Sequence, residues 1–453
     1  MKILIAGAGK VGKSITDELS ADGNDITMID RNADVLNDVI EKYDVNTCEG
    51  NAASSIVLKE AGVEDADIFI AVADADEINL LACITARALN PKIHVIARIR
   101  NPEYAEQAYV LKDSFHLSLS INPEKQAAQE IAGLLKYPGF LKRERFEKAR
   151  TEMVELRAES SSALADVKLT DLQKRINAQI LISAIIRDGN VILPDGNTVI
   201  QSHDRLIITG RSSELQKMLK NIGVITKPVR HVLISGGGRI AFYLAQLLDD
   251  AHISTTIIEQ DEDTCELLAG LLSNTTIVHG DASSHNVLEN ADIQSYDAFV
   301  SLTGIDEVNI ITSLYADVLN IKHIITKLGR GEQSLLTDHL PLGSIVCPKD
   351  LVTMHIVRYV RAIQDKKGVA ITIHKIADGR VEAIEFEVKE HDRYIGKPLK
   401  DIRMKKNILI NSIRTGLETV IPNGNSAYHL GDTVVVLCKG DEVIHTLNDI
   451  FES

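Results

Sequence analysis

The sequence predicts an α/β protein that contains two doubly wound, Rossmann-like parallel-sheet domains, each followed by a small α+β domain. Short, fully apolar strands alternate with helical patterns at intervals of roughly 20–30 residues, which is typical of a parallel sheet covered by helices. A glycine-rich turn joins the first strand to the first helix. The same order of elements recurs in the second half of the 453-residue chain, and a repeat of this kind indicates duplicated domains.

The duplication is visible in the residues themselves. Residues 3–12 read ILIAGAGKVG and residues 232–241 read VLISGGGRIA, at an offset of 229. The helix start at residues 76–79 recurs at 306–309, at an offset of 230, and the second part of each half repeats at an offset of 228. The predicted units are residues 1–121 (first Rossmann domain), 122–150 (crossover helices and linker), 151–226 (first small α+β domain), 227–347 (second Rossmann domain), 348–370 (crossover helix and linker) and 371–453 (second small α+β domain).

Each element of the first large unit follows from its hydrophobic pattern. Apolar runs predict strands at residues 3–6, 26–29, 45–48, 68–72 and 93–97. Helical patterns are found at residues 11–20, 54–61 and 76–89. The small units instead show short strands separated by turn residues, at 179–186, 191–193 and 205–209 in the first copy and at 408–413, 419–421 and 433–437 in the second.

A long helix is predicted between the large and the small unit of each half. Asn122 is suited to cap it, Pro123 fits the first helical position, and Glu124 suits the first turn. The apolar positions of this helix, which is expected to end near Lys136, form one stripe and therefore predict a buried face. Residues 348–363 are its counterpart in the second half.

A run of charges follows the first of these helices, at residues 142–145 (Lys-Arg-Glu-Arg). We interpret this run as the solvent-exposed face of a helix. Contact with a partner at a membrane surface is the alternative interpretation.

The glycine-rich turn carries the functional prediction. Gly7 would allow the tight turn, Gly9 would let a pyrophosphate approach the backbone, and Gly12 would let the helix pack on the strand. The N-terminus of the following helix offers free N–H groups and a positive dipole to phosphates. Asp30 lies 18 residues after Gly12, at a strand end, where it can accept hydrogen bonds from ribose hydroxyls. An acid there favours NAD or adenosine over NADP, because it would repel the 2′-phosphate of NADP. The neighbouring Arg31 would instead attract that phosphate.

The second copy carries a related turn. Gly236 and Gly238 correspond to Gly7 and Gly9, and Arg239 follows them directly. Ala241 stands where the first copy has Gly12, and Glu259 corresponds to Asp30. The nucleotide fingerprint tolerates alanine at this third position. A glycine turn without a ligand remains the alternative, and it carries more weight in the second copy than in the first.

Further loops end at the same edge of each predicted sheet, where ligands of such folds bind. The additional candidates there are Asn51, Ala73, Asp74 and Arg98 in the first copy and Asp281 and Lys327 in the second. A basic side chain at this edge can face a phosphate. For Asp74 or Asp76 a helix N-cap is an equally good interpretation, and for Arg98 a simple ion pair is the alternative.

Composition restricts the class of protein. Hydrophobic residues make up 45% and charged residues 25% of the chain, as in ordinary folded domains. The formal net charge of −15 argues against nucleic acid as a partner, because such binders carry a basic face. The sequence shows neither an apolar run of the roughly 18–20 residues that cross a bilayer nor a signal-peptide pattern. Its 5 cysteines form no Cys-x-x-Cys pair, so we expect free thiols and a cytoplasmic protein.

Enzymatic chemistry is not indicated by the remaining residues. The sequence has no nucleophile motif, no metal-ligand cluster and no Walker loop, and its histidines are not placed beside carboxylates in any motif. A second nucleotide unit occupies the place where a dehydrogenase would carry a substrate domain. A non-catalytic nucleotide sensor is therefore predicted. An NAD-dependent dehydrogenase is the first alternative, and an NAD-responsive transcription regulator is disfavoured by the acidic charge.

Taken together, the motif at residues 1–12, Gly50-Asn51-Ala52, the helix start at residues 76–79 and the duplicated large–small order resemble the TrkA family over essentially the whole chain. These proteins are the cytosolic nucleotide-binding regulators of Trk potassium-uptake systems and are built from tandem RCK (KTN) domains. The chain departs from the family pattern at Asn51, where an aspartate is usual, and at Ala241.

The resemblance implies a regulatory subunit that is peripheral on the inner face of the cell membrane and gates a TrkH-type potassium-transporting subunit. It implies a homotetramer, hence a ring of eight RCK domains that bind NAD(H) and ATP/ADP. A regulator of another transporter, such as a potassium efflux system, is a further alternative. The candidate cofactor-binding residues are Gly7, Gly9, Lys10, Val11, Gly12, Asp30, Arg31, Asn51, Ala73, Asp74 and Arg98 in the first copy and Gly236, Gly238, Arg239, Ile240, Glu259, Asp281 and Lys327 in the second; no catalytic or metal-binding residue is expected.

Overall fold

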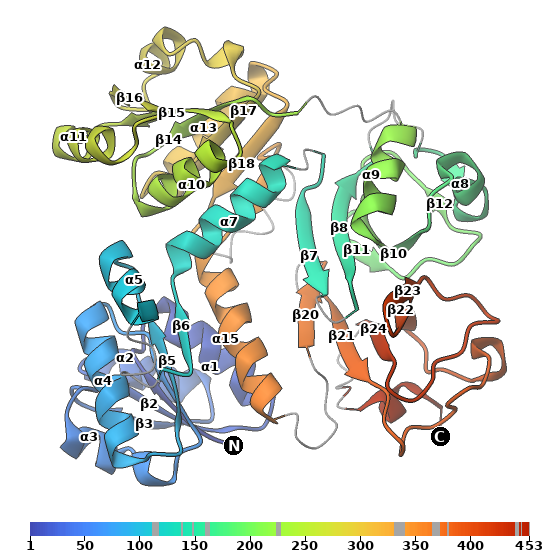
Figure 1. Cartoon of the computed structure of the whole chain (residues 1–453), viewed down its shortest axis with the longest axis horizontal. Helices are drawn as coiled ribbons and strands as arrows, with labels where there is room; N and C mark the ends of the chain where they lie inside the picture. The colour runs from blue at the N-terminus through green and yellow to red at the C-terminus, as the bar shows by residue number, and fades with distance from the viewer. Residues whose placement is uncertain are drawn as a thin grey trace.

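The computed structural model describes residues 1–110, 117–136, 139–146, 149–158, 164–222, 228–329, 340–364, 372–377, 380–439, 444 and 446–452. The chain forms two parallel-sheet units and two antiparallel-sheet units, with two long helices between them (Figure 1). The predicted boundaries 226/227 and 370/371 lie outside the described residues. Within the described ranges, no helix is both long enough and apolar enough to span a membrane.

The two parallel units have matching elements. The first consists of β1 (Lys2–Ala6), α1 (Lys10–Ala21), β2 (Asp25–Asp30), α2 (Ala33–Lys42), β3 (Asn46–Glu49), α3 (Ser55–Glu60), η1 (Val63–Asp65), β4 (Ile68–Ala71), α4 (Asp76–Leu89), β5 (His94–Arg98), α5 (Pro102–Val110) and β6 (Leu119–Ile121). The second consists of β14 (His231–Ser235), α10 (Arg239–Asp250), β15 (Ser254–Glu259), α11 (Glu262–Leu271), β16 (Thr275–His279), α12 (His285–Asn290), η2 (Ile293–Ser295), β17 (Ala298–Ser301), α13 (Asp306–Val318), β18 (His323–Lys327) and β19 (Ser344–Val346).

Both parallel sheets have the same strand order. It is β3-β2-β1-β4-β5-β6 in the first unit and β16-β15-β14-β17-β18-β19 in the second, and the adjacent strands are parallel. The central strands β1 and β14 are buried from their second residue onward, which explains their continuous apolar runs. The predicted doubly wound fold is confirmed. The helices α2 and α5 and the edge strand β6 are additional to the predicted elements.

The two antiparallel units also share one strand order. The first contains β7 (Lys142–Phe146), β8 (Thr151–Arg157), β9 (Val167–Lys168), α8 (Leu169–Ile176), β10 (Ile180–Arg187), β11 (Asn190–Ile192), β12 (Val199–Ile200), β13 (Arg205–Gly210) and α9 (Ser212–Asn221). The second contains β20 (Thr372–Ile376), β21 (Val381–Glu387), η5 (Leu399–Asp401), β22 (Ile408–Thr415), β23 (Glu418–Val420), β24 (Thr433–Lys439) and η6 (Leu447–Ile450). Their five-stranded sheets run β11-β10-β13-β8-β7 and β20-β21-β24-β22-β23.

The antiparallel sheets meet at two equivalent irregularities. The register of β10 shifts at Ser183, and the register of β22 shifts at Asn411. These two fully buried residues hydrogen-bond to each other, with 2.7 Å between the Ser183 hydroxyl and the Asn411 amide oxygen. The Asn411 amide nitrogen donates to the Thr209 hydroxyl at 3.0 Å. The two small units therefore contact each other through corresponding positions, as expected for a pseudo-twofold pair.

The charged run at residues 142–145 is a strand, so the prediction of an exposed helix face is wrong. It lies in β7, at the edge of the first antiparallel sheet and within the range predicted as a linker. Arg143 forms a two-pronged ion pair with Glu152 on β8, at 2.8 and 2.7 Å. Their side chains are only 8% and 13% exposed. The charges thus stabilise the pairing of two strands.

The long helices are exchanged between the two halves (Figure 1). The predicted helix of the first half is α7 (Pro123–Lys136), and its counterpart is α15 (Pro348–Gln364). The apolar stripe of α7 packs into the core of the second parallel unit, against α10. The buried residues of α15 pack into the core of the first unit, against α1. Arg361 of α15 also forms a two-pronged ion pair with Asp22, at 2.8 and 2.9 Å.

Candidate functional site

The glycines of the first turn occupy three different environments. Gly7 has a φ of +105°, and a Cβ atom there would lie 2.8 Å from the backbone nitrogen of Ala73. A Cβ atom at Gly12 would lie 1.9 Å from the Gly7 carbonyl oxygen. Gly9 instead has no atom within 4 Å of a Cβ position. Gly7 and Gly12 therefore close the turn, whereas Gly9 presents open backbone at the N-terminus of α1.

Asp30 is hydrogen-bonded to the turn. The Ala8 backbone N–H donates to Asp30 Oδ2 at 2.7 Å, and the Asn32 N–H donates to Oδ1 at 3.0 Å. The carboxylate is half-buried at the end of β2, beside the glycine turn. Since an ionised carboxylate offers about four acceptor positions, these two bonds leave capacity for ligand hydroxyls.

The second turn repeats this geometry. Gly236 has a φ of +98°, and a Cβ atom there would lie 2.9 Å from the nitrogen of Thr303. Gly238 has open space around its Cβ position, as Gly9 has. The Gly237 N–H donates to Glu259 Oε2 at 2.6 Å, so this acid holds the turn as Asp30 does. Ala241 is fully buried in α10 at the place of Gly12.

The residues that begin the two helices have the same backbone conformation. The N-cap of α1 is Gly9, with φ −71° and ψ −171°, and the N-cap of α10 is Gly238, with φ −69° and ψ −177°. Lys10 and Arg239 follow these glycines and are exposed. The next residues are half-buried in the first copy (Val11) and buried in the second (Ile240). Arg31 is exposed, one residue beyond β2.

Asn51 and Asp281 make equivalent turns after β3 and β16. The Ala53 N–H donates to the Asn51 side-chain oxygen at 3.2 Å, and the Ser283 N–H donates to Asp281 Oδ1 at 2.8 Å. The amide at position 51 therefore preserves the local turn, although it lacks the charge that Asp281 has.

Arg98 and Lys327 bind carbonyl groups at corresponding places. The Arg98 guanidinium donates to the Ala73 carbonyl at 2.8 Å and lies 3.6 Å from the exposed carboxylate of Asp74, so the ion pair considered as the alternative for Arg98 is present. The Lys327 ammonium donates to the Thr303 carbonyl at 2.6 Å. Burial lowers the pKa of Arg98 and of Lys327. A phosphate at this edge would supply the negative charge that such partly desolvated cations favour.

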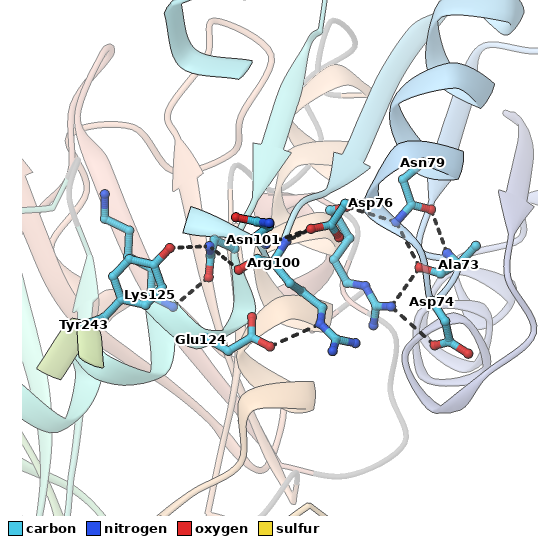
Figure 2. Close-up of polar contacts among 11 residues, drawn as sticks. Ala73, Asp74, Asp76, Asn79, Arg100, Asn101, Glu124, Lys125 and Tyr243 are labelled. Carbon is cyan, nitrogen blue, oxygen red and sulfur yellow. Dashed lines mark hydrogen bonds and ion pairs between the residues drawn. The ribbon is translucent and has the colours of Figure 1, made fainter. Parts of the chain in front are cut away.

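Asp76 does not cap α4, so that interpretation is wrong. The N-cap residue is Ala75, and no side chain caps this helix. Asp76 Oδ2 instead accepts hydrogen bonds from the backbone N–H groups of Arg100 and Asn101, at 2.8 and 2.7 Å (Figure 2). Its counterpart Asp306 accepts from the Gly329 N–H. Each of these acids holds the loop that follows the fifth strand.

Two buried asparagines are part of the site and were not among the predicted residues. Asn79 accepts a hydrogen bond from the Ala73 N–H and donates to the Ala73 and Arg98 carbonyls, at 2.8, 2.9 and 3.0 Å (Figure 2). Asn309 makes the same three contacts with Thr303 and Lys327. These amides fix the loops that carry the candidate ligand contacts. The sequence did contain a sign of their importance, because Asn79 and Asn309 recur at the offset of 230 residues. Both lie on the buried faces of their helices.

A polar cluster between the two parallel units was also not predicted. Glu124, in the first turn of α7, lies 3.3 Å from Arg100 of the first unit (Figure 2). Two residues earlier, the Asn122 amide donates to the Tyr243 hydroxyl on α10 of the second unit, at 3.0 Å. The two parallel units are therefore connected through the start of α7. Across the described ranges, no group of three or more His, Cys, Asp or Glu side chains is arranged to hold a metal ion.

Comparison with known proteins agrees with this architecture. The model of the TrkA-N domain family matches residues 3–114 and 232–374, and that of the TrkA-C domain family matches residues 153–223 and 383–451. The chain is 32% identical to a protein of Archaeoglobus fulgidus named "Trk system potassium uptake protein TrkA homolog", with 100% of both chains covered. It is 30% identical to the Haemophilus influenzae "Trk system potassium uptake protein TrkA", covering 100% of this chain and 99% of that one.

Solved structures show the same fold. The structure of the GsuK RCK domain superposes with a TM-score of 0.62 at 18% identity, covering 97% of this chain and 92% of that one. The GsuK channel bound to NAD superposes with a TM-score of 0.61 at 17% identity, covering 97% and 77%. The family models match most of the chain, and the curated relatives match it from end to end. With its two glycine turns and alternating domains, the chain belongs to the TrkA family.

Proposed function

We propose that this chain is the nucleotide-sensing regulatory subunit of a potassium-uptake transporter. It acts at the inner face of the membrane, where it gates a TrkH-type subunit through RCK domains that bind NAD(H) and ATP/ADP. The observation that carries the proposal is the pair of open glycine N-caps, Gly9 and Gly238, which have the same backbone conformation and which each precede a long helix. The names of the relatives add the transport system.

The nucleotide contacts are assigned by the chemistry of the residues present. The free N–H groups at the N-termini of α1 and α10 would bind the phosphates, with Lys10 and Arg239 supplying positive charge. Asp30 and Glu259 would accept hydrogen bonds from ribose hydroxyls. The cations Arg98 and Lys327 would face the phosphates from the loops at the same sheet edge.

Assembly into a homotetramer, and hence a ring of eight RCK domains, is part of the proposal. The helices α4 and α13 are equivalent, and both expose apolar side chains: Leu81 is 53% and Ile84 38% exposed on α4, and Ile311 is 64% and Val318 74% exposed on α13. Exposed apolar faces at two equivalent places on one chain fit contacts between copies.

Gating would follow from different affinities of a ligand for two ring shapes. ATP and ADP share their adenosine half, so the γ-phosphate would supply the difference by reaching a basic group of a neighbouring unit. A tenfold preference corresponds to about 1.4 kcal/mol per site. Several sites acting together would approach the roughly 5.5 kcal/mol that converts a 1:99 equilibrium into 99:1.

The test is nucleotide binding by the variants Gly9→Val and Gly238→Val. Each adds a side chain where the open backbone would meet phosphate, and each is expected to remove the NADH and ATP affinity of its own site in calorimetric titration. Gly270→Val on α11 is the control, since its Cβ also meets no atom within 4 Å. Unchanged nucleotide affinity in the double variant would contradict the proposal.

The regulatory part is tested by potassium flux in vesicles that contain a TrkH-type subunit. Adding the wild-type chain is expected to make the flux depend on ATP and ADP, and adding the double variant is expected to give a flux that does not. Steady hydride transfer to a small carbonyl substrate by the purified chain would instead support the dehydrogenase alternative.

A further inference from the structure

The polar cluster around Glu124 lies between the two candidate nucleotide sites. Glu124 Oε1 is 3.3 Å from Arg100 Nε, and the two side chains are 18% and 35% exposed (Figure 2). Arg100 lies just beyond β5, whose last residue is Arg98. Glu124 itself is the second residue of α7, which packs on α10 of the second unit. One carboxylate thus lies where the edges of both sites approach each other.

Cations from both halves of the chain act on this carboxylate. Burial raises the pKa of Glu124, and the charges of Arg100, Arg239 and Arg98 oppose that effect. Arg239 is the first residue of α10, directly after the open glycine of the second site. Glu124 in turn acts on Lys327, where its charge opposes the lowering of the pKa by burial. Two cations of each site are therefore coupled to one carboxylate.

The cluster is not a closed ion-pair network. Within the described part of the chain, Glu124 Oε2, Arg98 Nε and Asp76 Oδ1 are buried and have no hydrogen-bond partner. Arg98 is only 7% exposed and Asp76 only 8%. Buried polar groups are rarely left in this state. The Arg98 guanidinium and the Glu124 carboxylate therefore each keep an unused hydrogen-bonding atom in this cluster.

Glu124 is held in place while its charge partners can change. The Asn122 side chain accepts the Lys125 N–H at 2.8 Å as the cap of α7 and donates to the Tyr243 hydroxyl on α10 at 3.0 Å. The start of α7 is therefore tied to α10, which begins at the second site. The Glu124 carboxylate lies 3.3 Å from Arg100 Nε and also experiences the charge of Arg239, while the start of its helix is anchored to α10.

We propose that Glu124 links the two nucleotide sites antagonistically by competing with nucleotide phosphates for their cations. The inference rests on the proposed function. A phosphate in the first site attracts Arg98 and Arg100, and the released carboxylate then pairs with Arg239 and weakens phosphate binding in the second site. The reverse sequence holds for a phosphate in the second site, because such coupling is reciprocal. Glu124 is thus a positioning residue for charge and not a ligand contact.

The variant Glu124→Gln tests the competition, with ADP as the probe and adenosine as the reference. In the Gly9→Val background the titration measures ADP binding at the second site alone, and in the Gly238→Val background it measures binding at the first site alone. Removing the competing charge is expected to tighten ADP binding in each background by about fivefold, the lower end of usual coupling factors. Adenosine affinity is expected to stay unchanged, because it has no phosphate. In the chain with both sites intact, two-step ADP binding is expected to become a single step.

Two further variants separate charge competition from structure. Glu64→Gln makes the same change of charge at an exposed position in η1 and is expected to leave ADP affinity unchanged. Arg100→Gln removes the partner of Glu124 and is expected to weaken ADP binding at the second site. Adding Glu124→Gln to Arg100→Gln is expected to reverse that loss.

Several results would overturn the inference. ADP binding that is unchanged or weaker in Glu124→Gln, or an equal change for ADP and adenosine, is incompatible with competition for phosphate partners. Those results would leave the proposed function standing, because nucleotides would still bind both sites. Absence of ADP binding in the wild-type chain would remove the proposed function and this inference together.

Discussion

Single residues in the two sites divide into those that shape the turn and those that are open to a ligand. Gly7 and Gly12 cannot accept a side chain without moving backbone, whereas Gly9 can. The motif in the sequence indicated all three glycines, although the backbone that excludes a side chain at Gly7 belongs to Ala73, in the loop after β4. It could not predict that Asp30 also receives the Ala8 N–H, nor the role of Glu124. The role of Glu124 depends on groups from three elements that meet only in the folded chain.

Glu124 also leads to a prediction about pH. Burial raises its pKa above the ordinary value of 4.5, so the folded chain holds this proton more tightly than the unfolded chain. The carboxylate therefore costs no stability below pH 4.5 and destabilises the fold as pH rises through the raised pKa. Because glutamine resembles the protonated acid, we expect Glu124→Gln to gain stability relative to wild type as pH rises above 4.5, measured by urea unfolding. A constant or shrinking difference would contradict the raised pKa, and Glu64→Gln is the control.

At the scale of elements, hydrophobic patterns predicted much and misled in one place. The helix predicted at residues 76–89 has those bounds as α4, since its apolar face and its flanking loops agree. The run at residues 142–145 gave no apolar alternation, because β7 is an edge strand whose Arg143 is neutralised by Glu152. The stripe on α7 indicated a buried face but not its partner. Nothing in an amphipathic pattern distinguishes packing on the same half from packing on the other half.

Because the helices are exchanged, Arg361 of the second half forms an ion pair with the first half. Its two-pronged ion pair with Asp22 ties α15 to the end of α1, with side chains 11% and 24% exposed. We expect Arg361→Met, which keeps the apolar part of the side chain, to lower the free energy of unfolding by about 2 kcal/mol. Chemical denaturation measures this loss. Combined with Asp22→Asn, the two losses should be less than additive, and full additivity would show that the pair contributes nothing.

For the whole molecule, the two halves form one interlocked body with a pseudo-twofold relation. The crossover helices join the large units, and Ser183 and Asn411 join the small ones at matching register shifts. The duplication could be predicted from the sequence, because comparing similar residues at a fixed offset needs no structure. The position of the pseudo-twofold axis could not be predicted, since a repeated pattern does not say which faces of the two copies contact each other.

The proposed ring gives a prediction at this scale. Leu81→Asp together with Ile311→Asp places charges on the exposed apolar faces of α4 and α13. We expect light scattering to show a mass below that of the tetramer, with circular dichroism unchanged, because an unpaired charge in an interface is costly to desolvate. Leu417→Asp, at a residue that is 75% exposed in the second small unit, is the control. A tetramer that survives the double change would contradict assembly through these helices.

The exchange of α7 and α15 also affects how the chain can fold during synthesis. While a nascent chain is still short, the apolar face of α1 is uncovered, because residues 348–364, which pack against it, are synthesised much later. The first parallel unit is therefore synthesised first, but its core is completed only after α15 has been made. A chain that ended midway would leave that face of α1 exposed and would leave α7 without the surface on which it packs. Such a fragment would expose apolar side chains of α7 and of the first core to water, so the first half of the chain depends on the second for burial of its apolar surface.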